Sequence, residues 1–108
     1  MLLFKKKFLD AIRSGRKTQT IRLWSVCRFR AGQRSYIPGV GYIRITAVDR
    51  VPLNELTEPD AVLDGFASLA ELRAELESLY VKQLKSGSNV YRVRFAILPP
   101  EEQHKKRV

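Results

Sequence analysis

Cysteine and histidine are nearly missing from this chain, which has one of each among its 108 residues. The single Cys27 excludes a disulfide within the chain and a zinc site built on several thiolates. The single His104 lies in a charged C-terminal stretch, which argues against Ser-His-Asp or Cys-His catalysis. Any enzymatic activity must therefore work without a thiol, an imidazole or a metal cluster, and we expect no cofactor and no metal site.

Long apolar segments are missing as well. No apolar run approaches the roughly 18 residues that a membrane-spanning helix needs. The apolar residues at positions 1–4 precede Lys5, Lys6 and Lys7, which is the reverse of the order in a signal peptide. We therefore expect a cytoplasmic protein without a membrane partner. The apolar share of 44% predicts one globular domain with a modest core.

Positive charge is abundant and unevenly distributed, and the formal net charge is +9. Residues 1–50 contain twelve Lys or Arg and two acidic residues, a net charge of +10. Residues 51–108 contain eight Lys or Arg and nine acidic residues, a net charge of −1. Such asymmetry is typical of a protein that presents one face to a polyanion. The alternative is a basic protein with no charged partner.

The spacing of apolar residues predicts an α+β fold. A period near 3.6 predicts a helix over residues 4–13, and capping signals at 57–60 and 68–71 predict two more helices. Alternation of apolar and polar residues predicts strands over residues 18–24, 34–38, 41–51 and 90–98. In the third strand, Ile43, Ile45 and Ala47 should face one side and Val48 the other.

These strands are too few and too widely spaced for a doubly wound sheet. We therefore expect a small, mostly antiparallel β-barrel decorated by about three helices. This single domain should cover residues 1–98, and residues 99–108 should form a flexible basic tail.

Most of the candidate site residues fall in one octapeptide, Gly15–Arg22, between the first helix and the apolar pair Leu23 and Trp24. Its lysine and arginines supply charge, its threonines supply hydrogen-bond donors and acceptors, and its glycine lets a backbone come close. This mixture predicts a site for an anionic, planar, hydrogen-bonding ligand. The ligand-binding candidates within it are Gly15, Arg16, Lys17, Thr18, Thr20 and Arg22.

The pattern Gly15-x-Lys17-x-x-x-x-Arg22 resembles the signature of the ASCH domain, a branch of the PUA-like superfamily. Residues 56–58 with 64–68, and residues 90–95, agree with the same family. The resemblance covers residues 4–98 and points to the small, single-domain bacterial type. It implies a PUA-like β-barrel with a cleft beside the first helix.

The resemblance also implies nucleic-acid or nucleoside binding in that cleft. Some small bacterial members are similar to amidohydrolases that remove the acetyl group of acetylated cytidine, others are associated with RNA or DNA binding, and a few with RNA cleavage. The deacetylase-like pattern is a Lys, a Thr three residues later and a more distant Glu. Lys17 and Thr20 match this pattern, whereas the position of the Glu falls at Asp64, which is one methylene shorter.

Aromatic and arginine residues outside the octapeptide are candidates for further contacts. Trp24, Tyr36 and Tyr42 could stack on bases, although aromatic residues in small barrels more often belong to the core. Trp24 and Tyr42 join the ligand-binding candidates, together with a cationic rim whose alternative is a solvated face. The rim consists of Arg28, Arg30, Arg34 and Arg44.

Two functions remain open at this stage. The first is binding of nucleic acid, RNA above all, in a cationic cleft by a monomer or weak dimer. The alternative is an amidohydrolase of an acetylated cytidine nucleoside, or a weak ribonuclease, with Lys17 as base, Thr20 as nucleophile and Asp64 as acid or orienting group. In the alternative, Arg22 would polarise the amide carbonyl. A closed pocket in which these groups converge would favour the enzyme, and a cleft continuous with the arginine rim would favour the binder.

Overall fold

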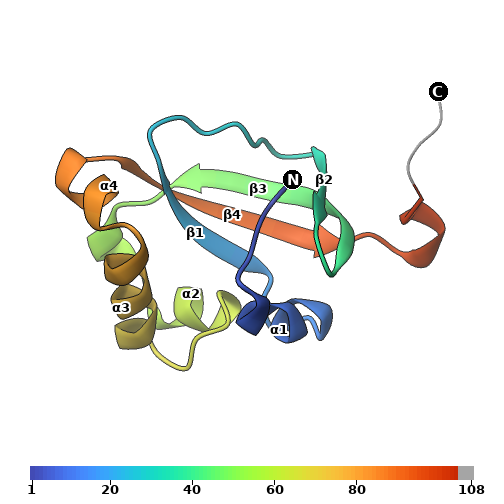
Figure 1. The fold of residues 1–108 in the computed structure, drawn as a ribbon, viewed down its shortest axis with the longest axis horizontal. Helices are drawn as coiled ribbons and strands as arrows, with labels where there is room; N and C mark the ends of the chain where they lie inside the picture. Colours follow the sequence, from blue (N-terminus) through green and yellow to red (C-terminus); the bar gives the residue numbers. More distant parts are fainter. Residues whose placement is uncertain (105–108) are drawn as a thin grey trace.

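Four strands pair into one antiparallel sheet in the order β1-β4-β3-β2 in the computed structural model, which describes residues 1–104 (Figure 1). Their bounds are β1 (Gln19–Trp24), β2 (Arg34–Ile37), β3 (Gly41–Arg50) and β4 (Asn89–Ile97). The two longest strands lie in the centre, and β1 and β2 form the edges. The predicted α+β class and the antiparallel pairing are confirmed.

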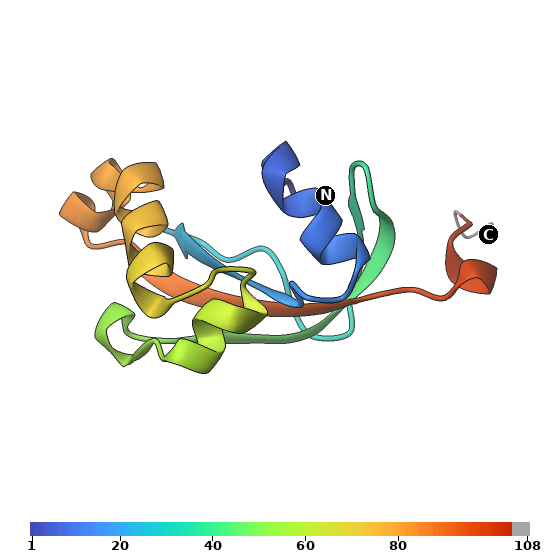
Figure 2. The same cartoon turned by 90° about the horizontal axis from the view of Figure 1, so that it is seen from below.

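The helices cover both faces and one end of this sheet. A 3₁₀ turn over Lys6–Phe8 leads into α1 (Leu9–Arg13), and α1 and α2 (Glu58–Leu63) lie on opposite faces (Figure 2). The longest helix, α3 (Leu69–Leu79), packs against α2 and is followed directly by α4 (Val81–Ser86). α4 adds to the three helices that the sequence predicts, and it ends at Gly87, whose φ of +74° suits a glycine.

Two hydrophobic cores fill the two faces. The α1-side core contains Leu2, Ile12, Ile37, Ile43, Ile45, Val93 and Phe95. The α2-side core contains Ile21, Leu23, Val51, Leu56, Ala61, Leu72 and Leu76. In β1 the alternation predicted from the sequence is confirmed, because Ile21 and Leu23 enter the α2-side core while Trp24 packs against the other. Thr20 and Arg22 therefore project toward α1.

A β-bulge changes the facing of β3 partway along the strand. Ile45 pairs with Phe95 and Ala47 pairs with Arg94, so Thr46 is an extra residue without a partner. An extra residue reverses the alternation beyond it. Val48 therefore packs against the α1-side core, and the prediction that Ala47 shares a face with Ile45 while Val48 opposes it is wrong.

The described part of the C-terminal segment is held against the sheet. A 3₁₀ turn over Pro100–Glu102 brings Gln103 beside β3. The Gln103 side chain donates to the carbonyls of Tyr42 (2.9 Å) and Leu98 (2.6 Å), and it accepts the Tyr42 N–H (2.7 Å). Residues 105–108 of the predicted basic tail lie outside the described residues. Within residues 1–104, no helix is long and apolar enough to cross a membrane.

Candidate functional site

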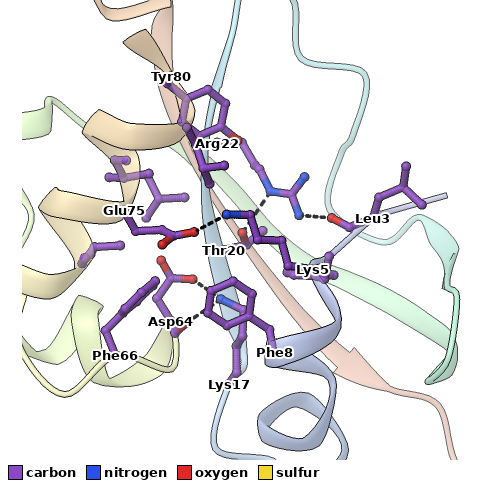
Figure 3. A pocket seen from close by; sticks show the side chains of 15 residues that line it. Leu3, Lys5, Phe8, Lys17, Thr20, Arg22, Asp64, Phe66, Glu75 and Tyr80 are labelled. Carbon is purple, nitrogen blue, oxygen red and sulfur yellow. Dashed lines mark hydrogen bonds and ion pairs between the residues drawn. The ribbon is translucent and has the colours of Figure 1, made fainter.

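A pocket of about 380 Å³ lies between the N-terminal segment, β1 and α3 (Figure 3). Its walls are largely apolar and aromatic, with contributions from Phe4, Phe8, Phe66, Leu76 and Tyr80. Six polar side chains lie among these walls. They are Lys5, Lys17, Thr20, Arg22, Asp64 and Glu75.

Two glycine turns bring Lys17 and Asp64 together. After α1 ends, Gly15 takes a φ of +82° and the Lys17 N–H donates to the Ala11 carbonyl at 3.0 Å, which turns the chain toward β1. Asp64 caps the C-terminus of α2, and Gly65 follows it with a φ of +89°. A Cβ atom on Gly65 would lie 3.3 Å from Lys17 Cδ, so the glycine leaves the space that the lysine stem occupies.

The Lys17 ammonium is buried and paired with Asp64. Its Nζ donates to the Asp64 backbone carbonyl at 2.5 Å and to the Asp64 carboxylate. Each residue is 3% exposed. The rings of Phe4, Phe8 and Phe66 surround the ammonium at 5.4, 4.9 and 5.9 Å from Nζ to the ring centroids. These are cation–π distances, so the ammonium is stabilised by rings as well as by the carboxylate.

Burial moves both members of this pair toward their neutral forms. It raises the pKa of Asp64 to about 6, although the Lys17 charge and hydrogen bond oppose the rise. It lowers the pKa of Lys17, although the Asp64 carboxylate opposes that change. Removing two charges from water is costly unless they satisfy each other. The hydrogen-bonded pairing of the two side chains therefore offsets part of the cost of burying them.

Arg22 and Thr20 share the α1-facing side of β1, as residues two apart on a strand do. Arg22 Nε donates to Thr20 Oγ1 at 3.0 Å, and Arg22 Nη2 donates to the Leu3 carbonyl at 2.5 Å. The guanidinium lies 4.7 Å from the Phe4 ring centroid. Arg22 thus holds the N-terminal segment over β1 and orients the Thr20 hydroxyl within the pocket.

Two ion pairs connect the N-terminal segment to α3 across the pocket. Glu75 accepts from Lys5 at 3.0 Å and from Lys7 at 3.2 Å, and Figure 3 shows Glu75 and Lys5 facing each other there. Burial favours a higher pKa for Glu75, but the two lysines outweigh it and hold the pKa below its usual value. Glu75 lies three residues after Leu72 and four before Leu79 on α3, and this helical spacing was the signal that sequence reasoning missed.

Other residues of the octapeptide lie outside this pocket. Arg16 is exposed and lines a neighbouring hollow, which shares Phe8, Phe66 and Glu75 with the pocket. The Thr18 N–H donates to the Leu63 carbonyl at 2.8 Å and its carbonyl accepts from Phe95 at 3.0 Å, so its backbone connects β1 to α2 and β4. Beyond the octapeptide, Trp24 also lies outside this pocket and stacks on Phe29 with the ring centroids 5.5 Å apart.

The predicted arginine rim lies apart from Lys17. Arg28, Arg30 and Arg34 line a different hollow formed by the loop between β1 and β2. Arg34 stacks on Tyr42 at 3.9 Å from the ring centroid, and Arg44 donates to the Gly32 carbonyl at 3.0 Å. The structure thus brings Lys17, Thr20, Arg22 and Asp64 together and places Tyr42, Arg44 and the rest of the rim elsewhere.

The chemistry of the pocket suits a planar, polar guest. Aromatic walls offer stacking surfaces, while the Thr20 hydroxyl, the Arg22 guanidinium and the Asp64 carboxylate offer hydrogen bonds of both kinds. Within residues 1–104, His, Cys, Asp and Glu side chains form no group of three or more that could hold a metal ion.

Solved structures with the same fold include an ASCH domain. That domain, from Lactobacillus crispatus JV V101, matches with a TM-score of 0.67 and 19% identity over 82% of this chain and 69% of its own. The hypothetical protein PH0355 matches with a TM-score of 0.74 and 13% identity, over 89% of this chain and 95% of its own. Protein EF3133 from Enterococcus faecalis V583, of the DUF984 family, matches with a TM-score of 0.65 and 23% identity, over 94% of this chain and 76% of its own.

No family model matches the chain, and no curated protein matches it. At these identities the structural matches speak for the fold. The predicted resemblance is confirmed at that level, and the chain has the fold of the ASCH domain structure.

Proposed function

We propose that the pocket binds a nucleobase, presented by single-stranded RNA or by a nucleoside. The observation that carries this proposal is the gathering of Lys17, Thr20, Arg22 and Asp64 in one pocket walled by phenyl rings. The volume of about 380 Å³ falls in the range of small-molecule sites, about 300–1,000 Å³. A base stacked between rings would meet a hydroxyl, a guanidinium and a carboxylate at its edge.

The distribution of charge supports a phosphate-bearing ligand. Exposed Lys5, Lys6 and Lys7 lie at the start of the 3₁₀ turn beside the pocket, within the half of the chain whose net charge is +10. A base paired in a regular RNA duplex cannot enter such a pocket, because it is stacked and hydrogen-bonded inside the helix. An unpaired base can be turned into it.

Binding of a labelled single-stranded RNA across a salt series tests this function. Arg22→Gln removes the guanidinium at the pocket and should weaken binding about tenfold or more, since charged hydrogen bonds are strong. Lys85→Gln on α4 is the matched control, because it removes the same charge from an exposed position. Equal affinities for Arg22→Gln and Lys85→Gln, or an affinity that does not change with salt, would speak against the proposal.

A second candidate function, hydrolysis of an acetylated cytidine nucleoside, is favoured by the Lys17–Asp64 pair. Transfer of a proton from Lys17 to Asp64 would leave a neutral amine, and burial shifts both pKa values in that direction. The amine could take the Thr20 proton as Thr20 Oγ1 attacks the amide carbon, and the departing amine of cytidine would receive that proton. Water would then hydrolyse the acetyl-threonine ester, releasing acetate and restoring Thr20.

Release of acetate from acetylcytidine tests the second candidate. Thr20→Val removes the hydroxyl at nearly the same volume and should abolish turnover if Thr20 is the nucleophile. Thr46→Val, at the bulge in β3, is the control for loss of a threonine hydroxyl. Turnover that is absent in the unmodified protein, or unchanged in Thr20→Val, excludes this mechanism.

A further inference from the structure

Arg22 and Leu3 form one boundary of the pocket, where the guanidinium donates to the Leu3 carbonyl. Arg22 and Leu3 also line a second hollow of about 300 Å³ on the other side of the N-terminal segment. Trp24, Val26, Arg28 and Phe29 form much of the rest of its lining. Because Arg22 and Leu3 belong to both linings and are hydrogen-bonded to each other, they form the wall between the two hollows.

One residue, Arg28, stands between the second hollow and the arginine-lined one. Arg28 lines the second hollow and also the open third hollow, whose other lining residues include Arg30, Gln33 and Arg34. The three hollows therefore lie in succession along β1 and the loop after it, with Arg22 and Leu3 between the first two and Arg28 between the last two. We call this sequence of three hollows the β1 groove.

The chemistry changes in order along the β1 groove. The first hollow combines polar groups with phenyl rings, and the second is mainly apolar, with Leu3 61% and Val26 63% exposed. The Trp24 and Phe29 rings there are stacked 5.5 Å apart at 22° and are each half-buried, so part of each remains accessible. The third hollow is cationic. The linings of the second and third hollows include no acidic residue.

Arg28 and Arg30 are available to an anion. Both are exposed, and neither makes an ion pair within residues 1–104. Arg34 is more constrained, since it donates to the Glu102 carbonyl at 2.8 Å and stacks on Tyr42. Two unpaired guanidiniums beside an exposed apolar and aromatic surface are the combination that single-stranded nucleic acid uses, with bases on rings and phosphates on arginines.

We propose that the β1 groove binds single-stranded RNA over several nucleotides, with one base in the pocket, its neighbour on the Trp24–Phe29 hollow, and later phosphates at Arg28 and Arg30. This inference rests on the proposed binding of a base in the pocket and adds the rest of the footprint. The ligand it names is a polynucleotide, and a free nucleoside would fill only the first part. A strand that occupies the first two hollows crosses the wall formed by Arg22 and Leu3.

Affinity as a function of ligand length tests this footprint. The probes are cytidine, cytidine monophosphate and a single-stranded cytidylate hexanucleotide, measured by calorimetry or by displacement of a labelled hexanucleotide. The hexanucleotide should bind at least about tenfold more tightly than the monophosphate, because it adds stacking and phosphate contacts. A preformed duplex of the same length should compete poorly.

The paired substitution Arg28→Gln with Arg30→Gln separates the groove from the pocket. It should weaken the hexanucleotide and reduce the slope of log affinity against log salt by about 1.4, at about 0.7 for each phosphate contact on a single strand. It should leave cytidine binding unchanged. The pair Lys82→Gln with Lys85→Gln, exposed on α4 and outside the three linings, controls for the loss of two charges.

The outcomes distinguish the two proposals. If the hexanucleotide binds no more tightly than the monophosphate, or if the arginine pair behaves as the lysine pair does, the extended footprint is overturned while binding in the pocket stands. If the duplex competes as well as the single strand, the footprint is overturned as well. If neither cytidine nor the hexanucleotide binds, or if Arg22→Gln changes neither affinity, the proposed function fails and the footprint fails with it.

Discussion

Lys17 and Asp64, which are 47 positions apart, meet through two hydrogen bonds from one ammonium, to the carboxylate and to the backbone carbonyl of the same residue. Double attachment fixes the end of α2 against the start of β1. It also places a proton donor and an acceptor together at 3% exposure. The pair is thus both a structural contact between two elements and part of the pocket lining.

Breaking this pair from one side should destabilise the fold strongly. Lys17→Met leaves a buried carboxyl without its partner, and Asp64→Leu leaves a buried ammonium, so each should cost about 3–5 kcal/mol of unfolding free energy. The double variant leaves neither charge and should recover much of the loss. Urea denaturation of the four proteins measures this coupling. Additive losses in the double variant would show that the two side chains are not energetically paired.

The pKa values of the two carboxyls of the α2 region, Asp60 and Asp64, should be shifted in opposite directions. The pKa of Asp64 is raised from 3.8 to about 6 by burial. Burial also opposes ionisation of Asp60, but hydrogen bonds from Gln19, Thr57 and Arg92 outweigh it and lower the pKa of Asp60 below 3.8. Carbon-detected NMR of the side-chain carboxyls should therefore give two well-separated midpoints, four residues apart in the sequence.

The sign of the stability effect follows from the raised pKa of Asp64. Between about pH 4 and pH 6 the folded chain keeps a proton that the unfolded chain has released, so this carboxyl makes the unfolding free energy fall as pH rises through that window. Asp64→Asn has no proton to release and should lack this component. A single midpoint for Asp60 and Asp64, or an unchanged pH profile in Asp64→Asn, would contradict the assignment.

Local sequence signals predicted the parts of the fold that depend on neighbours in the chain. The alternation of Ile21 and Leu23 placed β1 correctly, and Thr57 caps α2 with a reciprocal bond to Asp60. The bulge at Thr46 had no such signal, because it is defined by which residues of β4 stand opposite. Its consequence, the inward turn of Val48, could not be read from β3 alone.

The sequence predicted which residues line the candidate site better than it predicted their burial and their neighbours. The octapeptide and the Asp64 position indicated four residues that the structure brings to one pocket. The burial of Lys17 depends on phenyl rings from two separate segments, Phe4 and Phe8 in one and Phe66 in the other, which no local pattern connects. The arginine rim was expected around Lys17, but the long loop between β1 and β2 carries Arg28 and Arg30 to a different hollow. Loop paths of this kind are set by tertiary packing.

Gly65→Ala should be more harmful than Gly87→Ala, although both glycines have a positive φ. Each substitution places a Cβ in the left-handed region, which costs about 1–2 kcal/mol. At Gly87 the new Cβ meets nothing within 4 Å, whereas at Gly65 it lies 3.3 Å from Lys17 Cδ. Gly87→Ala therefore measures backbone strain alone. Thermal unfolding of both variants measures the loss of stability, and the additional loss in Gly65→Ala reports the contact with Lys17. Equal losses would show that the Lys17 side chain moves away from the new Cβ at no cost.

Glu75→Gln should strengthen RNA binding. The Glu75 carboxylate occupies the ammonium groups of Lys5 and Lys7 at the pocket, and neutralising it leaves both lysines free for phosphate. Affinity at low salt should rise severalfold, and its salt dependence should steepen by up to about 1.4, the value for two added contacts with a single strand. Stability should change little, because the lysine side chains of both ion pairs are 50% and 56% exposed, and pairs with exposed partners contribute about 0–1 kcal/mol.

Glu77→Gln provides the control for this prediction. Glu77 is exposed on the same helix, two residues further on, and therefore projects in a different direction from Glu75. The Glu77→Gln substitution changes the net charge by the same amount but leaves the ion pairs of Lys5 and Lys7 with Glu75 in place. If both variants gain affinity equally, the effect is one of overall charge and Glu75 has no special place at the pocket. If only Glu75→Gln gains affinity, Lys5 and Lys7 contact the RNA, and their ion pairs with Glu75 compete with that contact in the unmodified protein.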